Sequence, residues 1–538
     1  MKGFWLSFIC CKCLLATPIF NTQTDLENYL LESQTFYETM TSEQASVIST
    51  IGVGTPFTPG TNPTLNPPAR TTPPSNPPAP TAAASYLPFV IVNNSTFLDS
   101  QVYISIIGAQ LVGTTAQTQK MYVTFAGGNT GVGSYNLVPG SGSGSVAPIA
   151  LTTLKSMGTH TWGFYIPSND SGSNGISGAR VYFQVQTGTA TTLITYNNGA
   201  LTEPSVLNQS LDSYGVSFDK FEFAYVPQGS PQISCDATAV DFFCLPLLGY
   251  LSTPDAGNSS TSGIYESQSY VMTQTVPYFF NTVCTSAAIL AQWNHLFSPN
   301  TASPIRILSP ASASSVGTSS SFPNQFDPNY FDNAAAYGFS YLQYLWYGAG
   351  SFYRVNPLNF TIPPNSAWTQ LNFAARIDSS NNMDFSPAFS TESQSYFPAP
   401  STAGATAPSP NGPTSYQIMA AQNLNPTFAA NLQGNQVSKL FEEALMVGLL
   451  PVAFPSGNPL SNGYFSANSG SYYSNFNKLP ASAGGPWYSL YAQAIHYCGN
   501  IYAFGFDEPL YPNVLMNCTT QTTNTYIGIT IGTCDLVP

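Results

Sequence analysis

Charge is scarce in this sequence, and positive charge is scarcest. Only 7% of the 538 residues are charged, and 12 basic residues stand against 25 acidic ones, which gives a formal net charge of −13. A surface of this sign repels phosphate backbones and anionic membranes, so nucleic acid is not an expected partner. The surface must instead be built from Ser, Thr, Asn, Gln, Gly and Tyr, which is typical of secreted proteins that handle neutral polar ligands such as glycans.

Histidine and the common catalytic motifs are scarce as well. The three histidines, His160, His295 and His496, are scattered along the chain. The sequence contains neither a G-x-S-x-G elbow nor an H-E-x-x-H pair, which disfavours a serine nucleophile and a zinc site. Carboxylates are therefore the side chains from which we expect the chemistry.

Long apolar runs are absent after the N-terminus. No later stretch reaches the roughly 18 consecutive apolar residues of a membrane span, so we expect no span. Residues 1–20, "MKGFWLSFICCKCLLATPIF", have the basic start and apolar stretch of a secretory signal peptide, although Lys12 interrupts the apolar part. A buried N-terminus is the alternative. The leader reading predicts a secreted or cell-surface protein.

Nine cysteines are present, and three of them, Cys10, Cys11 and Cys13, belong to this leader. The other six are Cys235, Cys244, Cys284, Cys498, Cys518 and Cys534. An even number without a metal-type C-x-x-C pair predicts three disulfide bonds, with the pairing left open.

Composition divides the rest of the chain into three parts. Residues 21–85 form a Pro/Thr-rich spacer, in which ten of the 25 residues from 56 to 80 are proline, and we expect it to be disordered. Residues 86–255 contain short runs of alternating apolar residues, such as "LPFVIVNN" and "KFEFAYV", which predict an antiparallel β-sandwich or barrel. Residues 256–538 mix such runs with helical spacing and predict an α/β domain.

Three segments carry the helical spacing: residues 285–297, 436–450 and 487–497. Near the end of the chain, "NTYIGITIGTC" is a further strand that is able to return to the β-sandwich or barrel. The whole chain is therefore expected to be mainly β.

In the segment "FDKFEFAYVPQGSPQISCDATAVDFFCLPL", Glu222 and Asp241 each lie inside an otherwise apolar, strand-like run, one on each side of a turn. Alternation places Phe221 and Phe223 on a core face and turns Glu222 to the other face. A turn centred near Ser230 brings Asp241 close to Glu222, a few residues out of direct opposition.

This offset bears on chemistry. Opposed residues have Cβ atoms about 5 Å apart and diagonal ones roughly 7 to 8 Å apart. Glycosidases that retain configuration need about 5 Å between two carboxyl groups, and inverting ones roughly 6.5 to 9.5 Å. The offset favours inversion, while spacing alone also fits two solvated charges at a sheet edge.

The segments "DKFEFAYV" and "CDATAVDFFCLPL" resemble the catalytic hairpin of glycoside hydrolase family 64, the laminaripentaose-producing β-1,3-glucanases. Downstream, "IRILSP", "FEEALMVGLL" and "YAQAIHYCGNIYAFGFDEP" resemble later segments of the family in the same order. The resemblance covers residues 86–538. It implies a thaumatin-like fold, in which a β-sandwich or barrel domain and a mixed α/β domain flank a wide groove.

The resemblance also implies an activity: endo-acting, inverting hydrolysis of β-1,3-glucan to short oligosaccharides, without a metal or cofactor. The expected partner is the polysaccharide, and we expect a monomer. Trp162, Trp293 and Trp346 are candidates for stacking on sugar rings, although core packing is the commoner role of such residues.

Carried over to this sequence, the family pattern makes Glu222 the general acid and Asp241 the general base. Thr238 matches a residue that contacts glucan, and Asp236, which stands where Asn is usual, is a second substrate-binding candidate. Asp236 also rivals Asp241 as the base, but strand parity puts the two on opposite faces unless a bulge intervenes.

Two other functions stay open. The first is a thaumatin-like module that binds β-glucan without cleaving it and is displayed through the spacer. The second, a structural coat or adhesion protein, explains the low charge but not the hairpin with Glu222 and Asp241.

Overall fold

The computed structural model describes residues 86–279 with short gaps, residues 306–310 and 312, four strands between 358 and 397, residues 440, 443 and 446, and residues 489–534 with gaps. The expected leader, the spacer, Cys284, Trp293, Trp346 and the expected helix over 285–297 lie outside the described residues.

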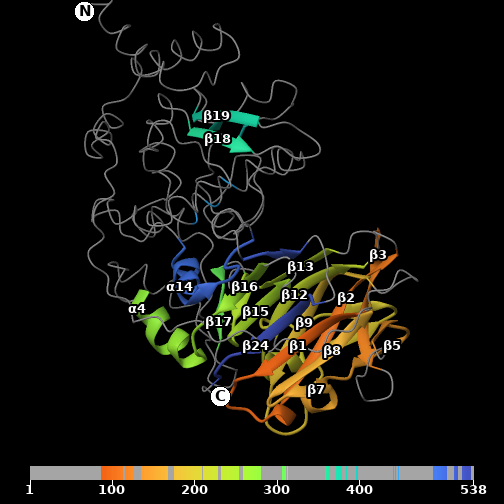
Figure 1. Ribbon diagram of the computed structural model, residues 1–538. Helices are drawn as coiled ribbons and strands as arrows, with labels where there is room; N and C mark the ends of the chain where they lie inside the picture. The colour runs from red at the N-terminus through yellow and green to blue at the C-terminus, as the bar shows by residue number, and fades with distance from the viewer. Residues whose placement is uncertain are drawn as a thin grey trace, which may run out of the picture.

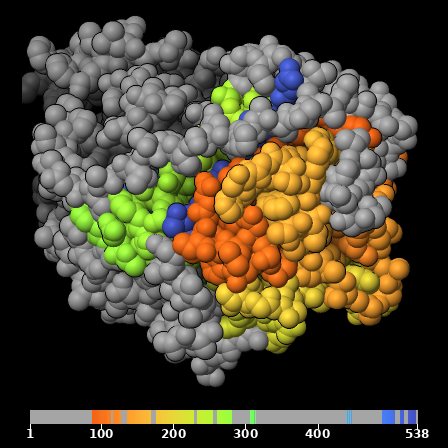
Figure 2. All heavy atoms as spheres, turned by 60° about the horizontal axis from the view of Figure 1, so that its bottom comes forward, coloured from red at the N-terminus to blue at the C-terminus, as the bar shows by residue number. Residues whose placement is uncertain are grey.

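Two large sheets form the body of the described protein (Figure 1). The first has seven strands in the order β22 (Gly499–Asn500), β16 (Asn258–Ile264), β15 (Leu247–Thr253), β24 (Tyr526–Ile531), β1 (Tyr86–Asn93), β8 (Thr161–Pro167) and β7 (Lys155–Gly158). All its pairs are antiparallel except β1 with β24. The C-terminal strand β24 therefore lies between β1 and β15, and Figure 2 shows blue C-terminal atoms between the orange and green segments.

The second sheet has eight strands. Seven follow the order β23 (Met516–Cys518), β13 (Gln232–Ala237), β12 (Ser217–Val226), β9 (Gly175–Val185), β2 (Val102–Val112), β3 (Thr115–Phe125) and β4 (Tyr135–Pro139), and β6 (Ile149–Ala150) pairs with β2. Its inner strand β12, which lies between β13 and β9, carries Glu222, so the position of this sheet decides the position of the candidate site.

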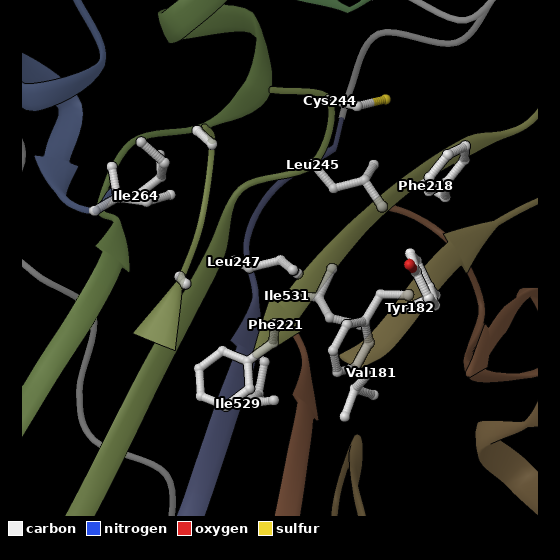
Figure 3. Close-up of a cluster of buried hydrophobic side chains, with 14 of the residues drawn as sticks. Val181, Tyr182, Phe218, Phe221, Cys244, Leu245, Leu247, Ile264, Ile529 and Ile531 are labelled. Atoms are coloured by element: carbon white, nitrogen blue, oxygen red, sulfur yellow. The ribbon is translucent and has the colours of Figure 1, made fainter. Parts of the chain in front are cut away.

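The core lies between the two sheets. Phe89 of β1 stacks on Phe164 of β8 at 4.7 Å, and it meets Phe221 and Phe223 of β12 at 6.4 and 5.5 Å between ring centroids. Figure 3 shows Phe221 and Val181 next to Ile529 and Ile531 in this layer. Each such buried side chain contributes about 1.5 to 3 kcal/mol. The prediction of a mainly β protein is thereby confirmed.

Smaller elements complete the described structure. A three-stranded sheet joins β5 (Ser143–Val146), β10 (Ile194–Asn197) and β11 (Ala200–Thr202). A two-stranded sheet joins β14 (Phe242–Phe243) and β17 (Ile307–Leu308), and a four-stranded one joins β18 (Leu358–Ile362), β19 (Leu371–Ile377), β20 (Met383–Asp384) and β21 (Tyr396–Phe397). The helical elements are η1 (Asp99–Gln101), η3 (Leu151–Thr153), η4 (Asp212–Gly215), η6 (Tyr270–Thr275), α4 (Val276–Tyr278) and α14 (Leu490–Cys498).

The run "AVDFFCLPLLGYL" forms two strands and not one. β14 pairs with β17, whereas β15 belongs to the seven-stranded sheet. The break has a physical cause, because Pro246 has no N–H group to donate and the N–H groups of Cys244 and Leu245 donate to the carboxylate of Asp219.

The expected helix over 487–497 is confirmed as α14. Its first turn is capped by the hydroxyl of Ser489, which accepts from the N–H of Ala492. Of the expected helix over 436–450, three residues are described, and Leu440, Glu443 and Met446 are all helical and buried.

The prediction of three disulfide bonds is not confirmed. Five of the six cysteines lie in the part of the chain that the structure describes, and all five are buried free thiols: Cys235, Cys244, Cys498, Cys518 and Cys534. Within the same part of the chain, no helix is long and apolar enough to cross a membrane.

Candidate active site

Glu222 lies on the outer face of the eight-stranded sheet, as the alternation of β12 predicts. Its neighbours Phe221 and Phe223 are buried in the core, whereas the Glu222 side chain is 32% exposed. A charged side chain at this position avoids the core without breaking the strand. The aromatic residues on either side hold the strand, and Glu222 faces away from the core.

The cross-strand partner of Glu222 is Asp236, not a residue near Asp241. β12 and β13 pair antiparallel with Glu222 opposite Asp236, so the hairpin is centred one residue before Ser230. On the other side, Arg180 of β9 is opposite Glu222. Opposed residues share a face, and Asp236, Glu222 and Arg180 therefore form one row across the outer face.

Strand parity does not separate Asp236 from Asp241. The two would face opposite ways only if regular alternation ran from 236 to 241, but β13 ends at Ala237 and β14 begins only at Phe242. Alternation does not extend through the residues between them. Asp236 and Asp241 are consequently both near Glu222, Asp236 in the sheet and Asp241 beyond the end of β13.

Asp241 is linked to Glu222 by the side chain of Lys220, which forms ion pairs with both. Lys220 lies two residues before Glu222 on the same face of β12, and its Nζ contacts Oδ2 of Asp241 and lies 3.8 Å from Oε1 of Glu222. The Lys220 side chain is only 7% exposed, whereas that of Asp241 is 51% exposed. One buried ammonium group thus bridges the two carboxylates that the sequence singles out.

Hydrogen bonds from several elements fix the segment that carries Asp241. The N–H of Ala239 donates to the carbonyl of Tyr502 at 2.7 Å, and the hydroxyl of Tyr491 on α14 donates to the carbonyl of Ala239. The N–H of Ser309 donates to the carbonyl of Asp241 itself at 3.0 Å. The backbone of this irregular segment is therefore held without a regular strand.

Asp219 supplies a further anchor from the opposite face of β12. Its Oδ2 accepts from the N–H groups of Cys244 and Leu245 at 2.9 and 3.0 Å, and its Oδ1 accepts from the N–H of Lys220. Burial raises the pKa of Asp219 to about 7, although the hydrogen bonds from Cys244, Leu245 and Lys220 act in the opposite direction. Asp219 thus ties the chain just after Asp241 to the strand of Glu222.

Thr238 lies at the end of β13 beside the same site. Its backbone forms a bridge with Tyr502, and its hydroxyl accepts from the N–H of Val240 at 3.4 Å. The residue is 6% exposed. Thr238 therefore lies in the chain between Asp236 and Asp241, and its contact with glucan stays a prediction.

The contacts of Glu222 continue away from Asp241. Arg180 donates from Nε to Oε1 of Glu222 at 3.0 Å and from Nη1 to Oε2 of Glu203 at 2.6 Å. Lys120 of β3 also contacts Glu203. Six residues of alternating charge are thereby linked, and we call them the ion-pair row: Lys120, Glu203, Arg180, Glu222, Lys220 and Asp241.

Glu203, which follows β11, has a strongly lowered pKa. Burial by itself raises its pKa, but hydrogen bonds from Lys120, Tyr182 and Arg180 outweigh burial and lower the pKa to about 2. Glu203 is therefore ionised at any working pH. It is a structural partner of Arg180 and not a proton donor.

Sequence reasoning did not identify Lys220, Arg180 and Glu203. A signal for two of them exists, because the chain has only 12 basic residues and both Lys220 and Arg180 lie inside strand-like runs. No local pattern marks Glu203, whose partners come from β3 and β9. Trp162 belongs to β8 of the other sheet and packs against the core, which favours a structural role.

Residues 85–509 match the family model described as β-1,3-glucanase, glycoside hydrolase family 64. A solved laminaripentaose-producing β-1,3-glucanase in complex with laminaritetraose is similar, with 16% identity, a TM-score of 0.55, and coverage of 84% of this chain and 100% of that one. A β-1,3-glucanase domain (GH64) from Clostridium beijerinckii has 17% identity and a TM-score of 0.52, over 85% and 100% of the two chains. No curated protein sequence matches the chain.

Proposed function

The chain belongs to glycoside hydrolase family 64, the β-1,3-glucanases, and from that premise we propose that it cleaves β-1,3-glucan internally and releases short oligosaccharides. The observation that carries the proposal is the meeting of Glu222 and Asp241 at the ammonium group of Lys220. Both carboxylates are open to solvent, so a sugar chain and a water molecule have access to them.

The reaction assigned to this pair is acid–base hydrolysis with inversion. In its protonated form, Glu222 gives its proton to the glycosidic oxygen while the bond from that oxygen to the anomeric carbon breaks. Asp241 takes a proton from the water molecule whose oxygen attacks the same carbon from the opposite face. The carboxylates come from different elements, β12 and the segment after β13, which supports two separate roles.

Substrate binding is assigned to the residues beside the pair. Asp236 lies directly opposite Glu222 on the outer face and is partly exposed, and Thr238 lies between it and Asp241 in the chain. We assign both to glucan contacts in a groove of a thaumatin-like fold.

Export and a monomeric state are part of the same proposal. The low charge and the leader pattern of residues 1–20 support a secreted or cell-surface protein. The five buried free thiols do not add to that support.

The experiment compares the full chain with the variant Glu222→Gln on soluble laminarin and on insoluble β-1,3-glucan. Chromatography of the released sugars measures cleavage, and co-sedimentation with the insoluble polymer measures binding. We expect short β-1,3 oligosaccharides from the parent and a loss of release of roughly 10² to 10⁴-fold in the variant, with binding retained in both. Binding by both proteins without release by either would instead establish a glucan-binding module.

A further inference from the structure

Lys220 is an unusual residue for its position. It is one of only 12 basic residues in the chain, and it is nearly buried on the outer face of β12. A buried ammonium group is costly unless it is paired. The buried lysine lies between the carboxylates of Glu222 and Asp241. Because its burial costs stability, we look for a role of Lys220 other than stabilising the sheet.

The backbone near Asp241 does not depend on Lys220. Ser309 binds the carbonyl of Asp241, and Asp219 binds the N–H groups of Cys244 and Leu245. What these contacts leave undetermined is the rotamer of the Asp241 side chain, which is half exposed. Among the described residues, Lys220 is the only cation that forms an ion pair with this carboxylate.

Glu222 differs in this respect, because it has a second cation. Arg180 donates to the same Oε1 atom that Lys220 approaches at 3.8 Å. Loss of Lys220 would therefore leave Glu222 paired through Arg180 and leave Asp241 without a cationic partner among the described residues. The effect of Lys220 should pass mainly through Asp241.

We propose that Lys220 is a positioning residue, whose ammonium group fixes the carboxylate of Asp241 relative to Glu222 in the orientation that water attack requires. This inference rests on the proposed function. A carboxylate that rotates away from the water by about 1 Å can lower the rate 10²-fold. Binding of glucan by the rest of the site should change little.

The test uses Lys220→Met, which keeps the apolar stem and removes the charge, and Lys220→Arg, which keeps the charge. Lys155→Met is the matched control, since Lys155 lies on β7 of the other sheet and donates to the hydroxyl of Tyr165 at 3.1 Å. Initial rates of laminarin hydrolysis give kcat and KM for each full-length protein, and thermal unfolding verifies the fold. Asp241 can be hydrated when the lysine is lost, so Lys220→Met should remain folded.

We expect Lys220→Met to lower kcat about 10²-fold with KM within about twofold of the parent. Lys220→Arg should recover part of that loss because it restores a positive charge between the two carboxylates, and Lys155→Met should match the parent. A kcat of Lys220→Met within threefold of the parent, or a loss confined to KM, would overturn the inference. A parent that releases no sugar would overturn the proposed function and, with it, the inference.

A double variant separates positioning from general damage to the fold. If Lys220 acts through Asp241, then Asp241→Asn and Lys220→Met/Asp241→Asn should have the same residual kcat. Once the carboxylate of Asp241 is replaced, removing the ammonium group that orients it should have no further effect on the rate. Multiplied losses in the double variant would show that Lys220 acts independently of Asp241 and would contradict the proposal.

Discussion

The two faces of β12 differ in composition and in role: one is apolar and packs in the core, and the other carries the charged residues of the candidate site. Phe221, Phe223 and Tyr225 point into the core, and the intervening Glu222 faces outward beside Lys220, in a chain with very few charges. The core face fixes the strand through apolar packing that tolerates little change. The outer face uses this rigid support to hold charged groups, so a substitution on one face should affect stability and a substitution on the other should affect activity.

The largest effect is expected on the outer face. Glu222→Gln should lower the rate of laminarin hydrolysis by roughly 10² to 10⁴-fold while the free energy of unfolding changes by less than about 1 kcal/mol. The reason is that Arg180 keeps Glu203 and Lys220 keeps Asp241 as partners. Urea denaturation and initial rates on the same preparations test both parts, and a variant that is inactive because it is unfolded would contradict the division between the faces.

The adjacent core residue gives the opposite outcome. Phe221→Ala should lower the free energy of unfolding by about 3 to 5 kcal/mol, because it leaves a cavity beside Phe89. Urea denaturation of the parent and the variant measures the difference. A loss below about 1 kcal/mol would mean that the core face of β12 is not the support described above.

Asp219 connects the two faces, and its loss should have an intermediate effect. Asp219→Asn turns an amide N–H₂ toward backbone N–H groups and should cost about 1 to 3 kcal/mol of stability. In Asp219→Ser the side chain is shorter and should not reach the N–H of Cys244. Comparing this variant with Asp219→Asn shows whether an oxygen acceptor at the position of Oδ2 is what stabilises the segment. Equal stability of the parent and Asp219→Asn would argue against Asp219 as an anchor.

The pH dependence of stability offers a second measure of Asp219. Its pKa of about 7 in the folded protein lies above the ordinary value of about 3.9, so the folded state holds a proton that the unfolded state releases. The resulting stabilisation is complete below about pH 4 and is lost as the pH rises through about 7. The urea midpoint of the parent should therefore fall further between these pH values than that of Asp219→Asn, and parallel curves would refute the assignment.

The smallest effect should come from Asp236, the rival for the general base. Asp236→Asn introduces the amide that the family pattern carries at this position and keeps a polar contact beside Glu222. We expect kcat within about tenfold of the parent, against a loss of roughly 10²-fold or more for Asp241→Asn. The reverse order of the two variants would transfer the role of base to Asp236.

The features that depend on local sequence patterns could be predicted from the sequence. Alternation identified the strand β12, the outward direction of Glu222 and the approach of Asp241, because period-two burial is a local property of the chain. Alternation also identified the strand β1, and helical spacing of apolar residues identified the helix α14.

The hairpin register, the break between β14 and β15 and the cationic partners of Glu222 depend on contacts between distant segments, which local patterns do not report. A shift of the hairpin centre by one residue placed Asp236 opposite Glu222, and no local pattern reports such a shift. The break between β14 and β15 follows from the capture of two N–H groups by Asp219, more than 20 residues earlier in the sequence. Arg180 meets Glu222, and Glu203 meets Arg180, only because the fold brings these distant segments together.

The stereochemistry of the first product tests the central claim most directly. Proton NMR spectra, recorded as the full-length protein acts on laminarin, identify the anomer of each newly formed reducing end before mutarotation, with Asp241→Asn measured in parallel. The acid–base pair of Glu222 and Asp241 predicts the α-anomer from the parent and almost no product from the variant. The β-anomer as first product, or equal product from Asp241→Asn, would contradict the account.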